Sequence, residues 1–128
     1  MKILGIGVDI IENNRIKKSI QNNKFKTRVY SSNELKLSKN VKNKVAYFSK
    51  RFAAKEAFSK ALGTGISENL NFKDIEIAND NKGKPKYAKN KKIIKIVQKK
   101  YRIKKFNSFL SISDEKDYSI AFAIIQSI

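Results

Sequence analysis

The sequence predicts a mixed α+β fold in a single domain that spans residues 1–128. Three observations carry this prediction: an alternating apolar segment at the N-terminus, a long helix with apolar residues almost all round, and two alternating segments around a polar turn near the C-terminus. With 41% hydrophobic residues, a chain of 128 residues has enough apolar surface for one core. No internal repeat and no linker divides the sequence.

The first two elements are a strand over Lys2–Ile11 and a short basic helix over 13–21. Apolar residues alternate along the strand, and Gly5, Gly7 and Asp9 fall on the same face. Because two glycines clear this face, a backbone or a ligand can approach the carboxylate closely. An acid near the end of a strand also often caps the next element, so both interpretations of the aspartate stay open at this point.

Two helices are expected in the middle of the chain. Ser31–Glu34 is typical of a helix start, with an acid in the first turn. A long helix is expected from about Lys44 to Leu62, and Gly63–Gly65 ends it. Apolar residues all round this helix are typical of packing on more than one side.

The second half predicts short strands, one amphipathic helix and a hairpin. In chain order these are strands over 74–78 and 86–87 with a turn over 79–83 between them, a surface helix over 89–101, and a hairpin of 107–113 with 118–126.

Composition excludes several kinds of chemistry. The sequence has no cysteine and no histidine, which excludes disulfides, thiolate nucleophiles and imidazole acid–base catalysis. Catalysis would have to use carboxylates, lysine, serine, tyrosine or a metal-bound water. Apolar runs are too short to span a bilayer and no signal peptide is recognisable, so we expect a cytoplasmic protein with no membrane partner.

The net charge of +18 predicts an anionic partner. The most one-sided segment is Lys82–Lys105, which contains no acidic residue. Such a run is more often a solvated face than a nucleic-acid site, and it lacks the interleaved aromatic residues that single-strand binders use. A small basic nucleic-acid-binding protein is therefore only the alternative function. Our main expectation is that the protein has no nucleic-acid partner.

Two charged residues of the long helix stand out. At about 100° per residue, Lys55 falls inside an apolar stripe and Glu56 lies beside it. Charges in such a place are costly unless they are paired or bound to a metal. In one interpretation Glu56 pairs with Lys60 at i+4 and Lys55 extends outward. In the other, Glu56 and Asp9 form a small carboxylate site for Mg²⁺.

Five motifs occur in a characteristic order along the whole chain. They are Gly5-Ile-Gly-Val-Asp-Ile-Ile-Glu12, Arg51-Phe-Ala-Ala-Lys-Glu-Ala-Phe-Ser-Lys-Ala-Leu-Gly-Thr-Gly65, Phe72-Lys-Asp-Ile-Glu-Ile77, Gly83-Lys-Pro85 and Leu110-Ser-Ile-Ser113. The sequence closely resembles the holo-[acyl-carrier-protein] synthases, the short bacterial family of 4′-phosphopantetheinyl transferases. The resemblance implies that family's fold, a small antiparallel sheet packed on a long central helix, in a homotrimer with active sites between subunits.

The resemblance also implies a reaction and its residues. A serine hydroxyl of apo acyl carrier protein attacks the pyrophosphate of coenzyme A, and adenosine 3′,5′-bisphosphate leaves. Asp9 and Glu56 hold Mg²⁺, and the serine proton passes to a metal-bound water or to one of the two carboxylates. The resemblance also implies a catalytic role for Lys60. It implies contacts to coenzyme A by Arg51, Lys55, Lys60, Ser59, Gly63, Gly83, Lys84 and Pro85. Contacts to the acidic acceptor are implied for Arg15, Lys24, Phe25 and Arg28.

One position departs from the family pattern. The family usually has a histidine after Ser-(Ile/Leu)-Ser, near bound coenzyme A, whereas this chain has Asp114. An acid facing phosphates repels them unless it points away or a lysine such as Lys116 compensates. A third reading, an inactive paralogue that docks carrier protein as an adaptor, follows from this departure.

Overall fold

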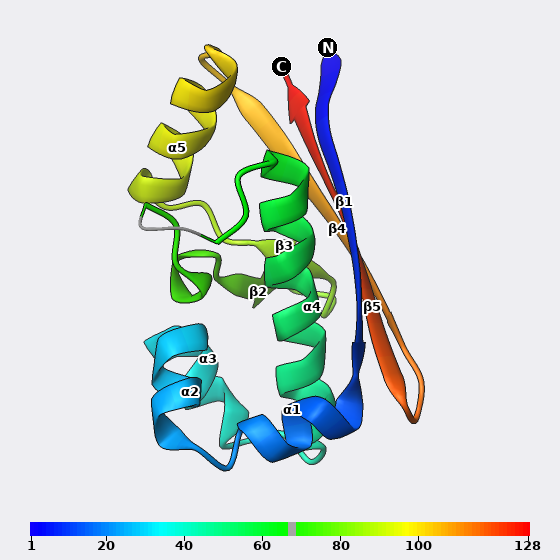
Figure 1. Ribbon diagram of the computed structural model, residues 1–128. Coiled ribbons are helices and arrows are strands. Elements are labelled where there is room, and N and C mark those ends of the chain that lie inside the picture. The colour runs from blue at the N-terminus through cyan, green and yellow to red at the C-terminus, as the bar shows by residue number, and fades with distance from the viewer. Residues whose placement is uncertain (67–68) are drawn as a thin grey trace.

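The fold consists of a three-stranded antiparallel sheet with a long helix along one face (Figure 1). A computed structural model describes residues 1–66 and 69–128. The sheet has β5 (Tyr118–Ser127) in the centre, between β1 (Lys2–Glu12) and β4 (Phe106–Asp114). Helix α4 (Lys44–Leu62) lies against β1 and β5. The prediction of a small antiparallel sheet packed on a central helix is therefore confirmed, and α4 has the bounds expected from the sequence.

The two glycines of β1 let α4 approach the sheet closely. A Cβ atom on Gly7 would lie 1.9 Å from the carbonyl oxygen of Ala57, and one on Gly5 would lie 1.8 Å from that of Ala61. No side chain fits at such distances. The two glycines of β1 therefore make room for the backbone of α4. The opposite face of β1 points away from the helix.

Helices α1 (Asn13–Ser19), α2 (Asn23–Val29) and α3 (Ser32–Ser38) cover one end of α4. The capping box predicted at Ser31 and Glu34 is present. Helix α2 was not expected from the sequence, although the Asn22 side chain caps it by accepting a hydrogen bond from the Lys24 amide at 2.8 Å. Among residues 1–66 and 69–128, the helices are all too short or too polar to traverse a bilayer.

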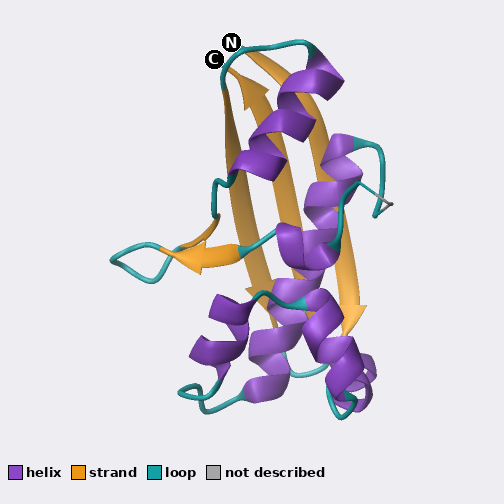
Figure 2. Cartoon of the chain, turned by 90° about the vertical axis from the view of Figure 1, so that its left-hand side faces the viewer, coloured by secondary structure: helices purple, strands orange, loops and turns teal. Residues whose placement is uncertain are grey.

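The strand predicted over 74–78 begins later than expected. A 3₁₀ turn, η1 (Phe72–Asp74), precedes β2 (Ile77–Asn79), because the Asp74 carboxylate accepts a hydrogen bond from the Asn71 amide at 2.9 Å and closes the turn. Strand β2 pairs with β3 (Pro85–Tyr87) in a separate hairpin that projects away from the main sheet (Figure 2).

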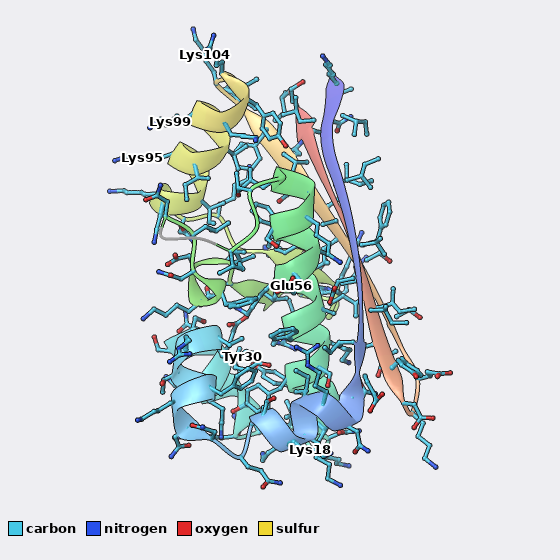
Figure 3. The ribbon with its side chains drawn as sticks, viewed as in Figure 1. Lys18, Tyr30, Glu56, Lys95, Lys99 and Lys104 are labelled. Atoms are coloured by element: carbon cyan, nitrogen blue, oxygen red, sulfur yellow. The ribbon has the colours of Figure 1, made fainter. Side chains whose placement is uncertain are left out.

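Helix α5 (Lys91–Tyr101) is the amphipathic surface helix that the spacing predicted. Ile93 and Val97 are buried beneath it, whereas Lys95 and Lys99 point away from the molecule (Figure 3).

The outer face of the main sheet carries no helix in the described part of the chain (Figure 1), and it exposes several large apolar residues. Val8 is 52% exposed and Phe122 is 39% exposed, although both lie in the middle of long strands. The large apolar residues of this outer face are Ile6, Val8, Ile10, Phe109, Ile120 and Phe122.

Candidate active site

Two carboxylates that are far apart in the sequence meet where α4 crosses β1. Asp9 lies opposite Ala121 on the face that α4 covers, and its side chain is only 13% exposed. Glu56 is half-buried midway along α4 (Figure 3). Burial raises the pKa of Asp9, and burial together with the Asp9 charge raises the pKa of Glu56. The structure therefore brings together the two acids that the sequence analysis singled out.

Two cations stand beside these acids. The Lys60 ammonium lies 3.1 Å from Asp9 Oδ1 and donates to the Val8 carbonyl at the same distance. The charges of Lys60 and Arg15 act to lower the pKa values of both carboxyls, against the larger effect of burial. Within the described residues, the ion pair of Lys60 is with Asp9, so the interpretation in which Lys60 pairs with Glu56 at i+4 is wrong. The reason is that Lys60 reaches across to β1.

The donor set suits a hard divalent cation. In the described part of the chain, no group of three or more acidic, histidine or cysteine side chains gathers in one place. Magnesium takes one or two protein carboxylates and completes its octahedron with water and substrate phosphate oxygens. A half-buried pair such as Asp9 and Glu56, with raised pKa values, fits that requirement because a cation would relieve both burial and mutual repulsion. The arrangement therefore suits a metal ion and a phosphate-bearing substrate.

Lys55 lies elsewhere, in the interior. Its side chain is fully buried, and its ammonium donates to Glu34 Oε1 at 2.7 Å. The other two hydrogen bonds go to the carbonyls of Phe72 and Ile75, at 3.0 and 2.8 Å. The expectation that Lys55 extends outward is wrong, and the three bonds leave it no free proton for a coenzyme A phosphate.

Arg51 occupies a different face of α4 from Glu56. Its guanidinium carbon lies 3.7 Å from the centroid of the Tyr47 ring, and Nη2 donates to Asn79 Oδ1 at 3.0 Å. The residue is 8% exposed, and Nε has no hydrogen-bond partner among the described residues. Arg51 lines a cavity of about 850 Å³ that Lys36 and Lys50 also border. The cavity carries a net positive charge. Within a single chain, however, Arg51 does not lie beside Asp9 and Glu56.

The remaining expected coenzyme A positions are at the end of α4 and in the β2–β3 turn. Ser59 is buried and donates to the Glu56 carbonyl within the helix at 2.8 Å, while Gly63 ends the helix with a φ of +82°. In the turn formed by Gly83, Lys84 and Pro85, the Gly83 carbonyl accepts a hydrogen bond from the Asn79 side chain at 2.9 Å. Asn79 thus joins this turn to Arg51, a link that the sequence analysis missed.

The expected acceptor-binding residues lie on α1 and α2. Arg15, Lys24 and Arg28 are exposed. Phe25 is half-buried, with its ring stacked on Phe52 at a centroid distance of 6.2 Å and edge-on to Tyr30. Three of the four positions thus present a cation to the surface, whereas Phe25 packs toward the interior.

Asp114 ends β4 and is exposed at the rim of a cavity of about 620 Å³. The adjoining turn is fixed by Asn13, whose amide nitrogen donates to the carbonyls of Glu115 and Lys116 at 3.0 Å each. The Asn13 amide oxygen accepts from Ser119 Oγ at 2.8 Å. Asn13 thereby ties the start of α1 to the segment that carries Asp114.

Comparison with known proteins gives concordant matches. The model of the 4′-phosphopantetheinyl transferase superfamily matches residues 5–123. A holo-[acyl-carrier-protein] synthase of Pelagibacter ubique is 62% identical over 126 residues, which cover 98% of this chain and 98% of the relative. The enzyme of that name from Buchnera aphidicola is 47% identical and covers 98% of this chain and 99% of its own length.

Solved structures match over the full fold as well. A Neisseria meningitidis holo-[acyl-carrier-protein] synthase has a TM-score of 0.87 at 36% identity and covers 98% of this chain and 99% of that one. A Bacillus anthracis holo-(acyl-carrier-protein) synthase in complex with coenzyme A (3′,5′-ADP) has a TM-score of 0.82 at 38% identity and covers 100% of both chains. The chain therefore belongs to the 4′-phosphopantetheinyl transferase superfamily and, within it, to the holo-[acyl-carrier-protein] synthases, as the sequence motifs predicted.

Proposed function

We propose that the chain transfers 4′-phosphopantetheine from coenzyme A to a serine of apo acyl carrier protein and releases adenosine 3′,5′-bisphosphate. The observation that carries this proposal is the meeting of Asp9 and Glu56 beside Lys60 and Arg15. A related structure from Bacillus anthracis was solved in complex with coenzyme A, which supports the same donor here.

Asp9 and Glu56 would hold the metal ion, which we infer to be Mg²⁺. When bound, the ion supplies charge neutralisation and orientation of the pyrophosphate. The Lys60 ammonium lies 3.1 Å from Asp9 Oδ1 and so orients the carboxylate toward the site. Since Lys60 is 52% exposed, its ammonium can also turn from the carboxylate to a substrate phosphate.

The chain has to accept one proton and bind one nucleotide. The serine oxygen forms a bond to the phosphorus on the pantetheine side, and the bond from that phosphorus to the bridging oxygen breaks. A carboxylate oxygen of Asp9 or Glu56 would accept the serine proton. Arg51 and the turn of Gly83–Pro85, joined through Asn79, form the proposed grip on the adenosine bisphosphate end.

The acceptor would dock on α1 and α2. Arg15, Lys24 and Arg28 are exposed there and fit an acidic carrier-protein helix. Arg15 also acts electrostatically on Asp9 and Glu56, so docking on α1 would bring the acceptor serine toward the two acids.

The test of the function is mass spectrometry of intact apo acyl carrier protein after incubation with this protein, coenzyme A and Mg²⁺. We expect the mass to increase by one phosphopantetheine group, and we expect chelation of the metal to abolish the increase. Docking of carrier protein without transfer would favour the adaptor. Salt-sensitive binding of nucleic acid without transfer would favour the alternative function.

We further propose that the apolar outer face of the sheet is the contact surface of a homotrimer. A contiguous exposed apolar face of this kind marks an interaction site. The family resemblance supplies the number of subunits. Active sites would then lie between subunits, where the Asp9–Glu56 pair of one chain can face Arg51 of another. A site between subunits would explain why Arg51 lies apart from Asp9 and Glu56 within a single chain.

The interface can be tested by placing a charge in its centre. We expect Val8→Lys to convert the trimer into monomers, because a buried ammonium without a partner cannot be accommodated between apolar faces. Analytical ultracentrifugation would report the mass of three chains for the wild-type protein and of one for the variant. Lys95→Glu on α5 is the control and should remain trimeric. A trimer that persists in Val8→Lys would place the interface elsewhere.

A further inference from the structure

The buried Lys55–Glu34 pair has no place in the proposed chemistry. Both side chains are completely inaccessible to solvent, and the ammonium and carboxylate are 2.7 Å apart. A buried pair of this kind is not required for stability, because apolar residues of similar volume often serve equally well. Its contacts therefore indicate what else it does.

The contacts hold both ends of one short segment. Lys55 donates to the carbonyls of Phe72 and Ile75, at the beginning and just past the end of η1. Glu34 Oε2 accepts a hydrogen bond at 2.9 Å from the amide of Ile77, the first residue of β2. The pair thus fixes where the chain leaves η1 and where the β2–β3 hairpin begins.

The hairpin depends on such anchoring. Each of its strands has three residues, and an isolated two-stranded hairpin is marginally stable at best. Its other anchors include the packing of β3 against β4, the Tyr87 hydroxyl, which donates to the carbonyl of Ala54 on α4, and Asn79, which accepts from Arg51 and donates to the Gly83 carbonyl. The position of the turn relative to Arg51 is therefore set from the base by the ion pair and at the far end by Asn79.

We propose that Lys55 and Glu34 are positioning residues, which hold the β2–β3 hairpin so that its Gly83–Pro85 turn and Arg51 bind the adenosine end of coenzyme A together. Lys55 acts through the hairpin and does not touch a phosphate. This inference rests on the proposed function and adds two residues that contact neither substrate nor metal.

The test uses the double variant Glu34→Leu with Lys55→Met, which removes the pair without leaving a charge unpaired. We expect the KM for coenzyme A to rise about tenfold or more, because small misplacements of a binding element have effects of this size. We expect kcat and the KM for carrier protein to change less than about twofold. Amide hydrogen exchange across residues 77–87 should accelerate, while exchange in β5 should stay unchanged.

The matched control is Val97→Ala, which creates a cavity at the fully buried base of α5, outside the hairpin, and lowers stability. If both variants raise the KM for coenzyme A equally, the positioning role is wrong. It is also wrong if kcat falls while this KM stays constant. Rapid exchange of the Ile77 amide in the wild-type protein would overturn the proposal without any variant.

Failure of the proposed function gives a different result. If the wild-type protein neither binds coenzyme A nor transfers phosphopantetheine, the function is wrong, and hydrogen exchange across residues 77–87 still decides whether the pair holds the hairpin.

Discussion

Replacing Glu56 by glutamine should abolish phosphopantetheine transfer, with a loss of about a thousandfold or more. The amide keeps the shape of the side chain but removes one of the two anionic oxygen donors that would hold the metal ion. Metal-bound charge stabilisation contributes several kcal/mol to such reactions, and about 1.4 kcal/mol corresponds to each factor of ten in rate. The measurement is the initial rate of transfer at saturating coenzyme A, and Asp9→Asn should behave alike.

The same variant should have the opposite effect on stability. Burial and the neighbouring Asp9 raise the pKa of Glu56 above its ordinary value of 4.5, so the folded metal-free chain binds this proton more tightly than the unfolded chain. The free energy of unfolding therefore falls as the pH rises from about 4.5 through the raised pKa. Because glutamine does not ionise, Glu56→Gln should unfold at a higher temperature than the metal-free wild-type protein at neutral pH.

Added Mg²⁺ should affect the stability of the wild-type protein and of Glu56→Gln differently. A ligand at 100 times its Kd stabilises the state that binds it by about 2.7 kcal/mol. We expect Mg²⁺ to raise the Tm of the wild-type protein and to leave that of Glu56→Gln nearly unchanged. Wild-type rates in Glu56→Gln, or an equal Mg²⁺ effect on both proteins, would show that this residue does not hold the metal.

Lys55→Met alone should destabilise the protein by about 3–5 kcal/mol, the usual cost of leaving one buried charge without its partner. The carboxylate of Glu34 is fully buried, so water cannot replace the ammonium. For a protein of this length, the loss corresponds to a fall in Tm of roughly 10–20 °C. Thermal unfolding at one fixed protein concentration, followed by circular dichroism, measures it.

Adding Glu34→Leu to Lys55→Met should restore at least half of the lost stability. The second substitution removes the unpaired charge, although the amides of Ser31 and Ile77 and the carbonyls of Phe72 and Ile75 still lose their partners. A double variant less stable than the single one would mean that the backbone contacts, and not the unpaired charge, dominate the loss.

Local sequence signals predicted most of the elements. Helix α4 has the bounds read from its pattern, because Asn43 caps its start and Gly63 adopts the left-handed conformation at its end. Strand β1 was predicted from its alternation. Helix α2 was missed although it is as long as α1 and α3, because the polar run Gln21–Asn23 at its start resembles an ordinary turn.

The candidate site was predicted in part. Asp9 and Glu56 were paired from the chemistry of carboxylates and from the family resemblance, and the structure places them together. The partner of Lys55 was not predicted, since Glu34 lies 21 positions away and already had a sufficient local explanation as part of the capping box. Asn79 gave no signal beyond that of an ordinary turn residue.

The sequence by itself determined the family, the order of the elements and the residue types that could perform the chemistry, because periodicity, caps and motifs are properties of neighbouring residues. Tertiary structure alone decided which charges face one another. The close approach of α4 to β1 at Gly7 brings Glu56 and Lys60 to Asp9, while another side of α4 buries Lys55 against Glu34 of α3. Burial and pairing depend on distances in space, and these are fixed only when the helix and the sheet pack.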